Sequence, residues 1–178
     1  LVRLADGEWA LVVERFDRVG GGRRHALSFA ALLEADYRVD LVDYHTLLDR
    51  TRRMTRDYGE VAQALRLAAF NVLAQNRDDH IKNISFLMDP AGGWRLAPAY
   101  DLTPAAGTGY HAMSCDGESL APDAGHVERL GLRAGFDRHQ VRAMLDELRA
   151  ALARWDEFAE RCEVPAAARR AVGAALLR

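Results

Sequence analysis

The sequence predicts an α+β domain that is mainly α, with a few short strands. Two long stretches, 58–75 and 137–161, carry apolar residues at helical spacing. Two short runs of strand-forming residues, 84–88 and 94–97, flank a turn sequence. The chain has 178 residues, of which 49% are hydrophobic and 28% charged. This composition is enough for one compact domain with a real core.

Short elements are expected in the N-terminal quarter. The run 9–16 is β-branched and aromatic, which predicts a buried strand. Three glycines at 20–22 then break the chain. Residues 28–34 combine a serine in a capping position with apolar residues at i, i+3 and i+4, which predicts a short helix. A second short helix is expected at 42–50.

The central region predicts a long helix that leads into a loop and a hairpin. Residues 58–75 have a wide apolar surface and no proline or glycine after Gly59, so this helix should be long and largely buried. The polar stretch 76–82 has no periodicity and reads as a loop. The strands 84–88 and 94–97 are joined by the five residues 89–93, which are rich in turn formers.

The C-terminal half begins with an irregular segment. Residues 103–135 are rich in Gly, Pro, Ser and Asp, which predicts a long loop region with short helical pieces. Helical spacing returns at 137–161. Pro165 is expected to start a terminal helix, because proline is favoured in the first helical turn.

Composition excludes several classes of protein. The formal net charge is −2, so a strongly basic surface for nucleic acid is not implied. No apolar run approaches the roughly 20 residues needed to cross a bilayer, and the N-terminus does not resemble a signal peptide. Cys115 and Cys162 lie far apart in unrelated contexts, which predicts reduced thiols rather than a disulfide. We therefore expect a cytoplasmic protein without a membrane partner.

Three oxygen-bearing side chains stand out by their spacing. Asp78 and Asn83 lie five residues apart on the predicted loop, and Asp101 follows the second strand. The hairpin should fold Asp101 back towards the loop. Phosphoryl transfer needs a carboxylate to orient the attacking hydroxyl and hard oxygen ligands for Mg²⁺, and protein kinases place these groups at the same spacing.

The motifs around these residues resemble those of a known family. The pattern D-x-H-x-K-N at 78–83, with Y-D-L-T-P at 100–104, resembles the HipA family of serine/threonine kinase toxins, which is distantly related to phosphoinositide lipid kinases. Residues 12–25 are similar to the family's hinge strand, and residues 111–118 to its downstream segment. The resemblance covers most of residues 10–130.

The resemblance implies a fold and a domain division. We expect the helical C-terminal lobe of a HipA-like kinase fold, with a short β-hairpin that carries the metal-binding Asp. Residues 1–18 would form the hinge strand region and residues 19–178 the helical lobe. The N-terminal lobe, with its phosphate-covering loop and strand lysine, is expected to be absent from this chain, since its single lysine, Lys82, lies in the loop.

The resemblance also implies roles for the loop residues. Asp78 would be the catalytic base, and Asn83 and Asp101 would be the Mg²⁺ ligands. The activity implied is transfer of the ATP γ-phosphate to a serine or threonine hydroxyl of a protein.

A second set of residues would contact the nucleotide. The hinge backbone around Glu14 would hydrogen-bond the adenine, and Phe16 would pack on it. Asp17 and His80 would contact the ribose or the phosphates. Lys82 would counter phosphate charge or brace the loop.

The implied biology is a toxin–antitoxin system. Family members phosphorylate proteins such as aminoacyl-tRNA synthetases and are neutralised by a helix-turn-helix antitoxin, so DNA would be contacted only through that partner. Without the N-terminal lobe, we expect this polypeptide to bind ATP weakly or not at all.

Plainer interpretations remain open. The loop 76–82 fits a solvent-exposed turn, and a non-catalytic module that engages an antitoxin or a dimer partner, or a small-molecule kinase of similar fold, would fit the motifs. His80 alone fits a structural histidine, and His111 a structural or surface one. The glycines at 20–22 lack the spacing of a phosphate-binding loop and predict a flexible turn.

Overall fold

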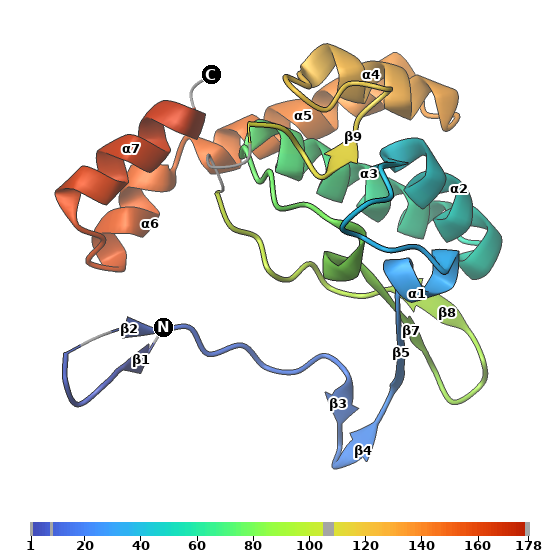
Figure 1. Cartoon of the computed structure of the whole chain (residues 1–178), viewed down its shortest axis with the longest axis horizontal. Coiled ribbons are helices and arrows are strands. Elements are labelled where there is room, and N and C mark those ends of the chain that lie inside the picture. The colour runs from blue at the N-terminus through green and yellow to red at the C-terminus, as the bar shows by residue number, and fades with distance from the viewer. Residues whose placement is uncertain (1, 8, 105–108, 177–178) are drawn as a thin grey trace.

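The computed structural model describes residues 2–7, 9–104 and 109–176, and it confirms a mixed, mainly helical fold. Several helices lie against one face of a small antiparallel sheet (Figure 1). The helices of this layer are α2 (Tyr44–Thr55), α3 (Tyr58–Leu73), α4 (Ala124–Arg133) and α5 (Arg138–Leu152). The sheet consists of β5 (His25–Ser28), β7 (Ser85–Met88) and β8 (Trp94–Leu96), in the order β5-β7-β8.

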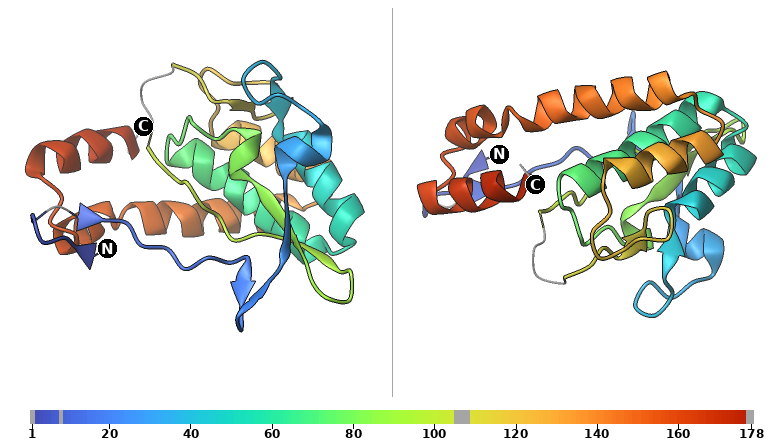
Figure 2. Two further views of the ribbon diagram at one scale, coloured as in Figure 1. Left: turned by 60° about the horizontal axis from the view of Figure 1, so that its bottom comes forward. Right: turned by 90° about the horizontal axis from the view of Figure 1, so that it is seen from above.

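Helix α3 is the centre of the core, and α2, α4 and α5 all pack on it (Figure 2). Its small residues Ala64 and Ala68 are fully buried, which lets neighbouring helices approach closely. Asp57 caps its first turn by accepting a hydrogen bond from the Gly59 amide at 2.7 Å. The predicted buried helix is thus confirmed. It ends two residues early, because Gln75 takes a left-handed conformation (φ 54°) that turns the chain into the loop.

The predicted hairpin is also confirmed. Strands β7 and β8 pair in antiparallel fashion, with Leu87 opposite Arg95, and five residues connect them. The Asp89 carboxylate organises this turn by accepting hydrogen bonds from the amides of Ala91 and Gly93, both at 2.8 Å. The short helix α1 (Phe29–Leu33) begins after Ser28, whose hydroxyl accepts a hydrogen bond from the Ala31 amide, as expected.

The second predicted helix is longer than expected and starts later. Residues Val42–Asp43 form strand β6, which pairs in parallel with β9 (Met113–Ser114), and α2 follows directly. The reason is Asp43, which stays extended and caps α2 by accepting a hydrogen bond from the His45 amide at 2.8 Å.

The buried strand predicted at 9–16 is wrong. The N-terminal strands are only two residues long, and Leu11, Val12 and Val13 are 77%, 65% and 64% exposed. Strand formation depends on neighbours to pack against, and none of the described residues pairs with 11–13. The strands of this region are β1 (Val2–Arg3), β2 (Trp9–Ala10), β3 (Arg18–Val19) and β4 (Gly22–Arg23).

The C-terminal half is more regular than predicted. The segment 103–135 contains a full helix, α4, because Asp123 and His126 form a reciprocal capping box at its start; residues 105–108 of that segment lie outside the described part. The stretch 137–161 divides into α5 and α6 (Trp155–Arg161). Pro165 lies just before α7 (Ala166–Leu176), not in its first turn, and its carbonyl accepts a hydrogen bond from the Arg169 amide. No described helix has both the length and the apolar character that a membrane span requires.

Close packing between α4 and the core can be tested at Gly131. A Cβ at this position would lie 2.6 Å from Val141 Cγ2 and 3.1 Å from Leu65 Cδ2. We expect Gly131→Ala to lower the free energy of unfolding by about 1–3 kcal/mol, measured by urea denaturation. Gly173→Ala on α7 is the control, because its Cβ would lie at an ordinary 3.4 Å from Trp155. It should be neutral or stabilising by up to about 1 kcal/mol. Equal effects of the two substitutions would contradict the close approach.

Candidate functional site

The loop after α3 is fixed at both ends. At its start, the Asn76 amide donates to the Asn71 carbonyl at 3.0 Å. At its end, residues Ile81–Asn83 form a short 3₁₀ turn, in which the Asn83 amide donates to the His80 carbonyl. Ile81 is 2% exposed and packs in the hydrophobic core. Residues 77–80 are thus held between a helix end and a core residue.

Asp79 points inwards from this loop and is 2% exposed. Its Oδ2 accepts a hydrogen bond from the Tyr44 hydroxyl at 2.7 Å and lies 3.1 Å from His111 Nδ1. Its Oδ1 accepts a hydrogen bond from the Met113 amide at 3.2 Å. A buried carboxylate is tolerated only when such donors satisfy it. Asp79 therefore ties the loop to α2 and to the segment that contains β9.

The network continues behind Tyr44. Asn71 Nδ2 donates to the Tyr44 hydroxyl at 2.9 Å, and Asn76 Nδ2 donates to Asn71 Oδ1 at 3.0 Å. Burial, with the nearby charge of Asp79, raises the pKa of Tyr44 well above its ordinary value. The hydroxyl therefore stays protonated and keeps donating to Asp79 at physiological pH.

Asp78 lies on the opposite side of the loop from Asp79. Its side chain is 57% exposed, and its Oδ1 lies 3.7 Å from His80 Nε2. Asn83 Nδ2 donates to the Asp78 backbone carbonyl at 3.2 Å. This hydrogen bond joins two residues five apart in the loop and holds the Asn83 side chain against the Asp78 backbone.

Tyr37, between α1 and α2, packs under the same loop. Its ring centroid is 4.8 Å from that of His80 and 4.6 Å from Lys82 Nζ, the latter a cation–π contact. His80 Nδ1 is buried and without a hydrogen-bond partner among the described residues. Tyr37 thus sets the positions of two of the residues to which the sequence assigns nucleotide contacts.

Tyr100 connects the hairpin to the loop. Its hydroxyl donates to the Lys82 carbonyl at 2.7 Å and lies 2.7 Å from the Ser85 hydroxyl. Asp101 follows immediately, exposed and in a left-handed conformation (φ 55°) that is uncommon outside glycine. Within the described chain its carboxylate has no hydrogen bond or ion pair. The hairpin therefore brings Tyr100, the residue before Asp101, back to the loop, as the sequence suggested.

The hinge residues lie beside Tyr100 but differ in their contacts. The ring of Phe16 is 5.5 Å from that of Tyr100. Asp17 is held by Arg15 at 2.7 Å, and this hydrogen bond lowers the pKa of Asp17 below its ordinary value. Glu14 is exposed and makes no hydrogen bond or ion pair to the rest of the described chain. The structure thus brings Phe16 to the site, whereas Glu14 and Asp17 only flank it.

A cavity of about 530 Å³ opens next to Phe16. It lies between α3, β8 and the residues that follow β8, and apolar side chains such as Leu67, Leu96 and Leu102 line much of it. Its volume falls within the range of small-molecule sites.

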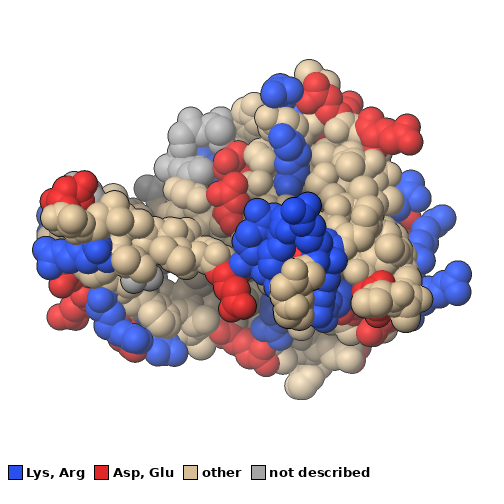
Figure 3. Space-filling model, turned by 90° about the horizontal axis from the view of Figure 1, so that it is seen from below, with Lys and Arg blue, Asp and Glu red and all other residues tan. Residues whose placement is uncertain are grey.

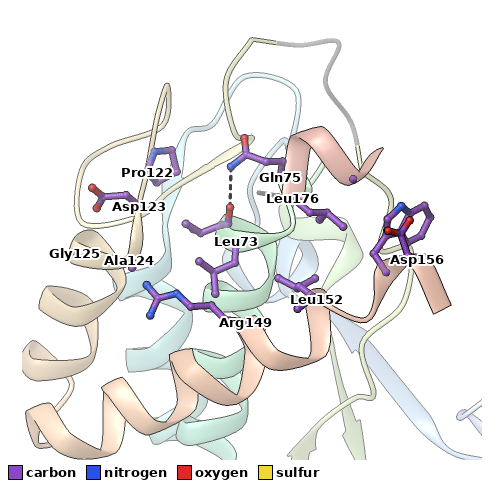
Figure 4. Close-up of a pocket in the computed structure, with 14 residues that line it drawn as sticks. Leu73, Gln75, Pro122, Asp123, Ala124, Gly125, Arg149, Leu152, Asp156 and Leu176 are labelled. Atoms are coloured by element: carbon purple, nitrogen blue, oxygen red, sulfur yellow. Dashed lines mark hydrogen bonds between the residues drawn. The ribbon is translucent and has the colours of Figure 1, made fainter. Parts of the chain in front are cut away.

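A slightly larger cavity, of about 580 Å³, lies where α3, α4, α5, α6 and α7 meet (Figure 4). None of the predicted site residues lines it. Its polar groups are engaged elsewhere: Gln75 donates to the Val72 carbonyl, Arg149 pairs with Asp146, and Asp156 pairs with Arg169. This cavity therefore offers apolar surface without free polar groups to orient a ligand.

Sequence reasoning missed the residues that support the site, Asp79, Tyr44, Tyr37 and Tyr100. Only Asp79 carried a usable signal, as the second acidic residue of an Asp-Asp pair. His111 is 1% exposed and faces Asp79, which confirms the structural role considered for it. In the same segment, burial raises the pKa of the Cys115 thiol to about 12.

No group of three His, Cys, Asp or Glu side chains in the described chain could hold a metal alone. The two-ligand set of Asn83 and Asp101 stays a prediction.

The network around Asp79 can be tested by removing one donor. Tyr44→Phe leaves the ring in place and deletes the hydroxyl that serves Asp79 and Asn71. Because a buried carboxylate loses a donor, we expect the free energy of unfolding to fall by about 1–3 kcal/mol in chemical denaturation. Tyr37→Phe is the matched control, since the Tyr37 hydroxyl has no hydrogen bond within the described residues, and it should change stability by less than about 0.5 kcal/mol. A neutral Tyr44→Phe variant would show that the Tyr44–Asp79 contact does not stabilise the fold.

Three comparisons place the chain among known proteins. The sequence model of the HipA-like C-terminal domain family matches residues 1–155. The protein Y4dM of Sinorhizobium fredii, named as a candidate kinase, is 33% identical over 95 residues, which are 52% of this chain and 23% of that protein. The solved structure of HipA from Shewanella oneidensis, in a complex with HipB and operator DNA, matches with a TM-score of 0.72 at 23% identity, over 92% of this chain and 46% of that one. The chain thus spans less than half the length of either protein. On the family match, which covers most of its residues, the chain belongs to the HipA-like C-terminal domain family.

Proposed function

We propose that this chain carries the base and the metal ligands of an ATP-dependent serine/threonine protein kinase. The observation that carries this proposal is the arrangement around the loop. Asp78 is exposed while its neighbour Asp79 is buried, and Tyr100 holds the start of the Asp101 segment against Lys82. Asp78 and Asp101 are thus both exposed, and each directly adjoins a residue that hydrogen bonds anchor, Asp79 and Tyr100.

The donor set fits Mg²⁺. Asn83 uses its Nδ2 on the Asp78 carbonyl, which leaves Oδ1 without a described hydrogen-bond partner. The Asp101 carboxylate is likewise unengaged in the described chain. Mg²⁺ prefers oxygen ligands and is commonly held by one or two protein side chains together with substrate phosphates. Asn83 and Asp101 would therefore suffice as protein ligands.

Asp78 would then act on the acceptor. When bound, Mg-ATP supplies the phosphoryl group and neutralises the charge that develops on it. Asp78 would orient the acceptor hydroxyl and take its proton. Its exposure leaves room for a protein segment to approach, and the hydrogen bond from Asn83 to its backbone carbonyl holds the Asp78 backbone in place.

Other residues would bind the nucleotide. Phe16 borders the apolar cavity and would pack on the adenine, with the backbone around Glu14 as its hydrogen-bonding edge. His80 and Lys82, both packed on Tyr37, would face the ribose or the phosphates. Asp17 is held by arginines, so we assign it the weakest role in this set.

The biological setting is proposed from the similarity to HipA. The matching structure contains HipB and operator DNA, which supports an antitoxin as a partner. From the family resemblance we propose that this antitoxin is a helix-turn-helix protein and that DNA is contacted only through it. A protein acceptor, such as an aminoacyl-tRNA synthetase, is proposed on the same ground. The chain covers 46% of HipA, so these partners are proposed for the longer protein that contains such a lobe.

The base assignment predicts the behaviour of Asp78→Asn. In a longer protein that contains this chain, the substitution should lower phosphate transfer from γ-labelled ATP into proteins of a cell extract by about 100-fold or more, because a general base contributes that much. Growth inhibition on expression should disappear as well.

Asp49→Asn on α2 is the control, since Asp49 is exposed and, among the described residues, pairs only with Arg53. It should leave the transfer rate within about twofold, because exposed ion pairs contribute little. Full transfer by a folded Asp78→Asn variant would refute the base assignment. A variant that still binds the antitoxin but transfers nothing would support it.

The nucleotide assignment predicts weak binding by the 178 residues alone. The lysine that pairs the α- and β-phosphates in kinases is not supplied here, because Lys82, the only lysine, is packed on Tyr37. Isothermal titration calorimetry with Mg-ATP should show little or no heat of binding. A submicromolar dissociation constant would contradict this expectation and would mean that the lobe holds the nucleotide without such a lysine.

A further inference from the structure

The short hairpin of β3 and β4 carries an unusual concentration of charge. Arg18 in β3 and Arg23 in β4 flank its turn, and Arg15 and Arg24 lie just outside. We call these four residues the arginine hairpin. Figure 3 shows a patch of basic side chains near the middle of this face of the molecule, with acidic side chains next to it.

The turn holds the hairpin in a defined shape. Val19 pairs with Gly22, and the two connecting glycines, Gly20 and Gly21, have φ of 56° and 79°. Two residues with positive φ form the turn type that matches the twist of paired strands. The glycines, for which the sequence predicted a flexible turn, thus form a regular hairpin turn between Arg18 and Arg23, which are exposed, whereas Arg24 is half-buried.

The charges of the hairpin are poorly compensated. Arg18 and Arg23 are direct cross-strand partners, an arrangement that destabilises a strand pair when both residues carry the same charge. Asp17 is the one carboxylate paired with the hairpin arginines in the described chain, and it is shared between Arg15 at 2.7 Å and Arg18 at 3.4 Å. Neither Arg23 nor Arg24 has an ion pair among the described residues. Keeping these charges together lowers the stability of the hairpin, and a bound anion would restore that stability.

The hairpin lies next to the candidate site. The Arg24 amide donates to the Asp17 carbonyl at 2.9 Å, so β4 runs beside the hinge residues. Phe16 contacts Tyr100, and Tyr100 is bonded to Lys82. A protein segment bound at the hairpin would be within a few side chains of the loop that carries Asp78.

We propose that the arginine hairpin is a docking surface for a short acidic segment of a protein partner. Guanidinium groups bind carboxylates in a bidentate manner, and Arg18 and Arg23, as cross-strand partners, lie on one face of the hairpin where a run of Asp or Glu residues would meet both. The inference rests on the proposed function only in taking that partner to be the phosphoryl acceptor; the binding itself does not require catalysis.

The charge outside the hairpin favours a short acidic peptide over nucleic acid. Residues 14–24 have four arginines and two carboxylates, a formal charge of +2, whereas the whole chain has −2. The remaining residues therefore carry −4. A nucleic acid has closely spaced charges along its whole length and would extend from the patch onto this negative surface. A short acidic segment would not.

The test is the binding of a fluorescein-labelled peptide of eight glutamates to the 178-residue chain, followed by fluorescence anisotropy at low salt. The Arg23→Gln/Arg24→Gln double variant removes the two unpaired charges of the hairpin. We expect it to bind the peptide about tenfold more weakly, with a shallower dependence on salt. Peptide binding that the double variant leaves unchanged would overturn the proposal, as would an absence of binding by the unmodified chain.

The matched control is Arg50→Gln/Arg170→Gln, which removes the same net charge from exposed positions on α2 and α7. It should change the affinity by less than about twofold. Equal losses in both double variants would mean that only the overall charge matters, which refutes a specific surface. A single-stranded oligonucleotide of eight phosphates is the second probe. Tighter, hairpin-dependent binding of that probe would assign the surface to nucleic acid and overturn the acidic-peptide assignment. Peptide binding without phosphoryl transfer by the longer protein would support this inference and count against the proposed function alone.

Discussion

The burial of the Asp79 carboxylate is the constraint on which the rest of the site depends. A charged group at 2% exposure is costly unless donors surround it, and its donors come from Tyr44 on α2 and from the segment of His111 and Met113. The loop, α2 and the segment of His111 and Met113 must therefore all be in place together. The parallel pairing of β6 and β9 brings the same two segments side by side, so the network and the strand pair stabilise each other. With Asp79 held inwards, the adjacent Asp78 side chain is left exposed.

A second attachment, on the far side of the loop, comes from the hairpin. Tyr100 reaches the Lys82 carbonyl from a position 18 residues along the chain, and the turn closed by Asp89 makes this return possible. Asp79 holds the loop from inside and Tyr100 holds it from the β-sheet side. The exposed carboxylates of Asp78 and Asp101 therefore sit on supports that are themselves buried or hydrogen-bonded, which is what a preorganised site requires.

The sequence predicted what depends on local pattern. The helix at 58–75, the five-residue hairpin connection and the spacing of Asp78, Asn83 and Asp101 all follow from residue order, and the structure has the helix and the hairpin nearly as expected. The sequence did not predict the features that depend on contacts between residues far apart in the chain. Nothing local distinguishes the buried Asp79 from the exposed Asp78, and nothing around Tyr37 points to the loop that it supports. The strand predicted over 11–13 did not form for the same reason. β-Propensity describes fit to neighbouring strands, and no strand of the described chain pairs with these residues.

The charge distribution around the site favours one orientation of an acidic partner. Asp78 and Asp101 place negative charge at the loop, while the arginine hairpin places positive charge beside the hinge, with Phe16 and Tyr100 between them. An acidic segment is attracted to the hairpin and repelled by the carboxylates of the loop. Docking at the hairpin would therefore keep the acidic residues of the proposed acceptor away from Asp78, so that only an uncharged part of it, such as a hydroxyl, would approach the proposed base. A reversed arrangement, with arginines at the loop, would draw the acidic segment onto Asp78, the proposed base, and block it.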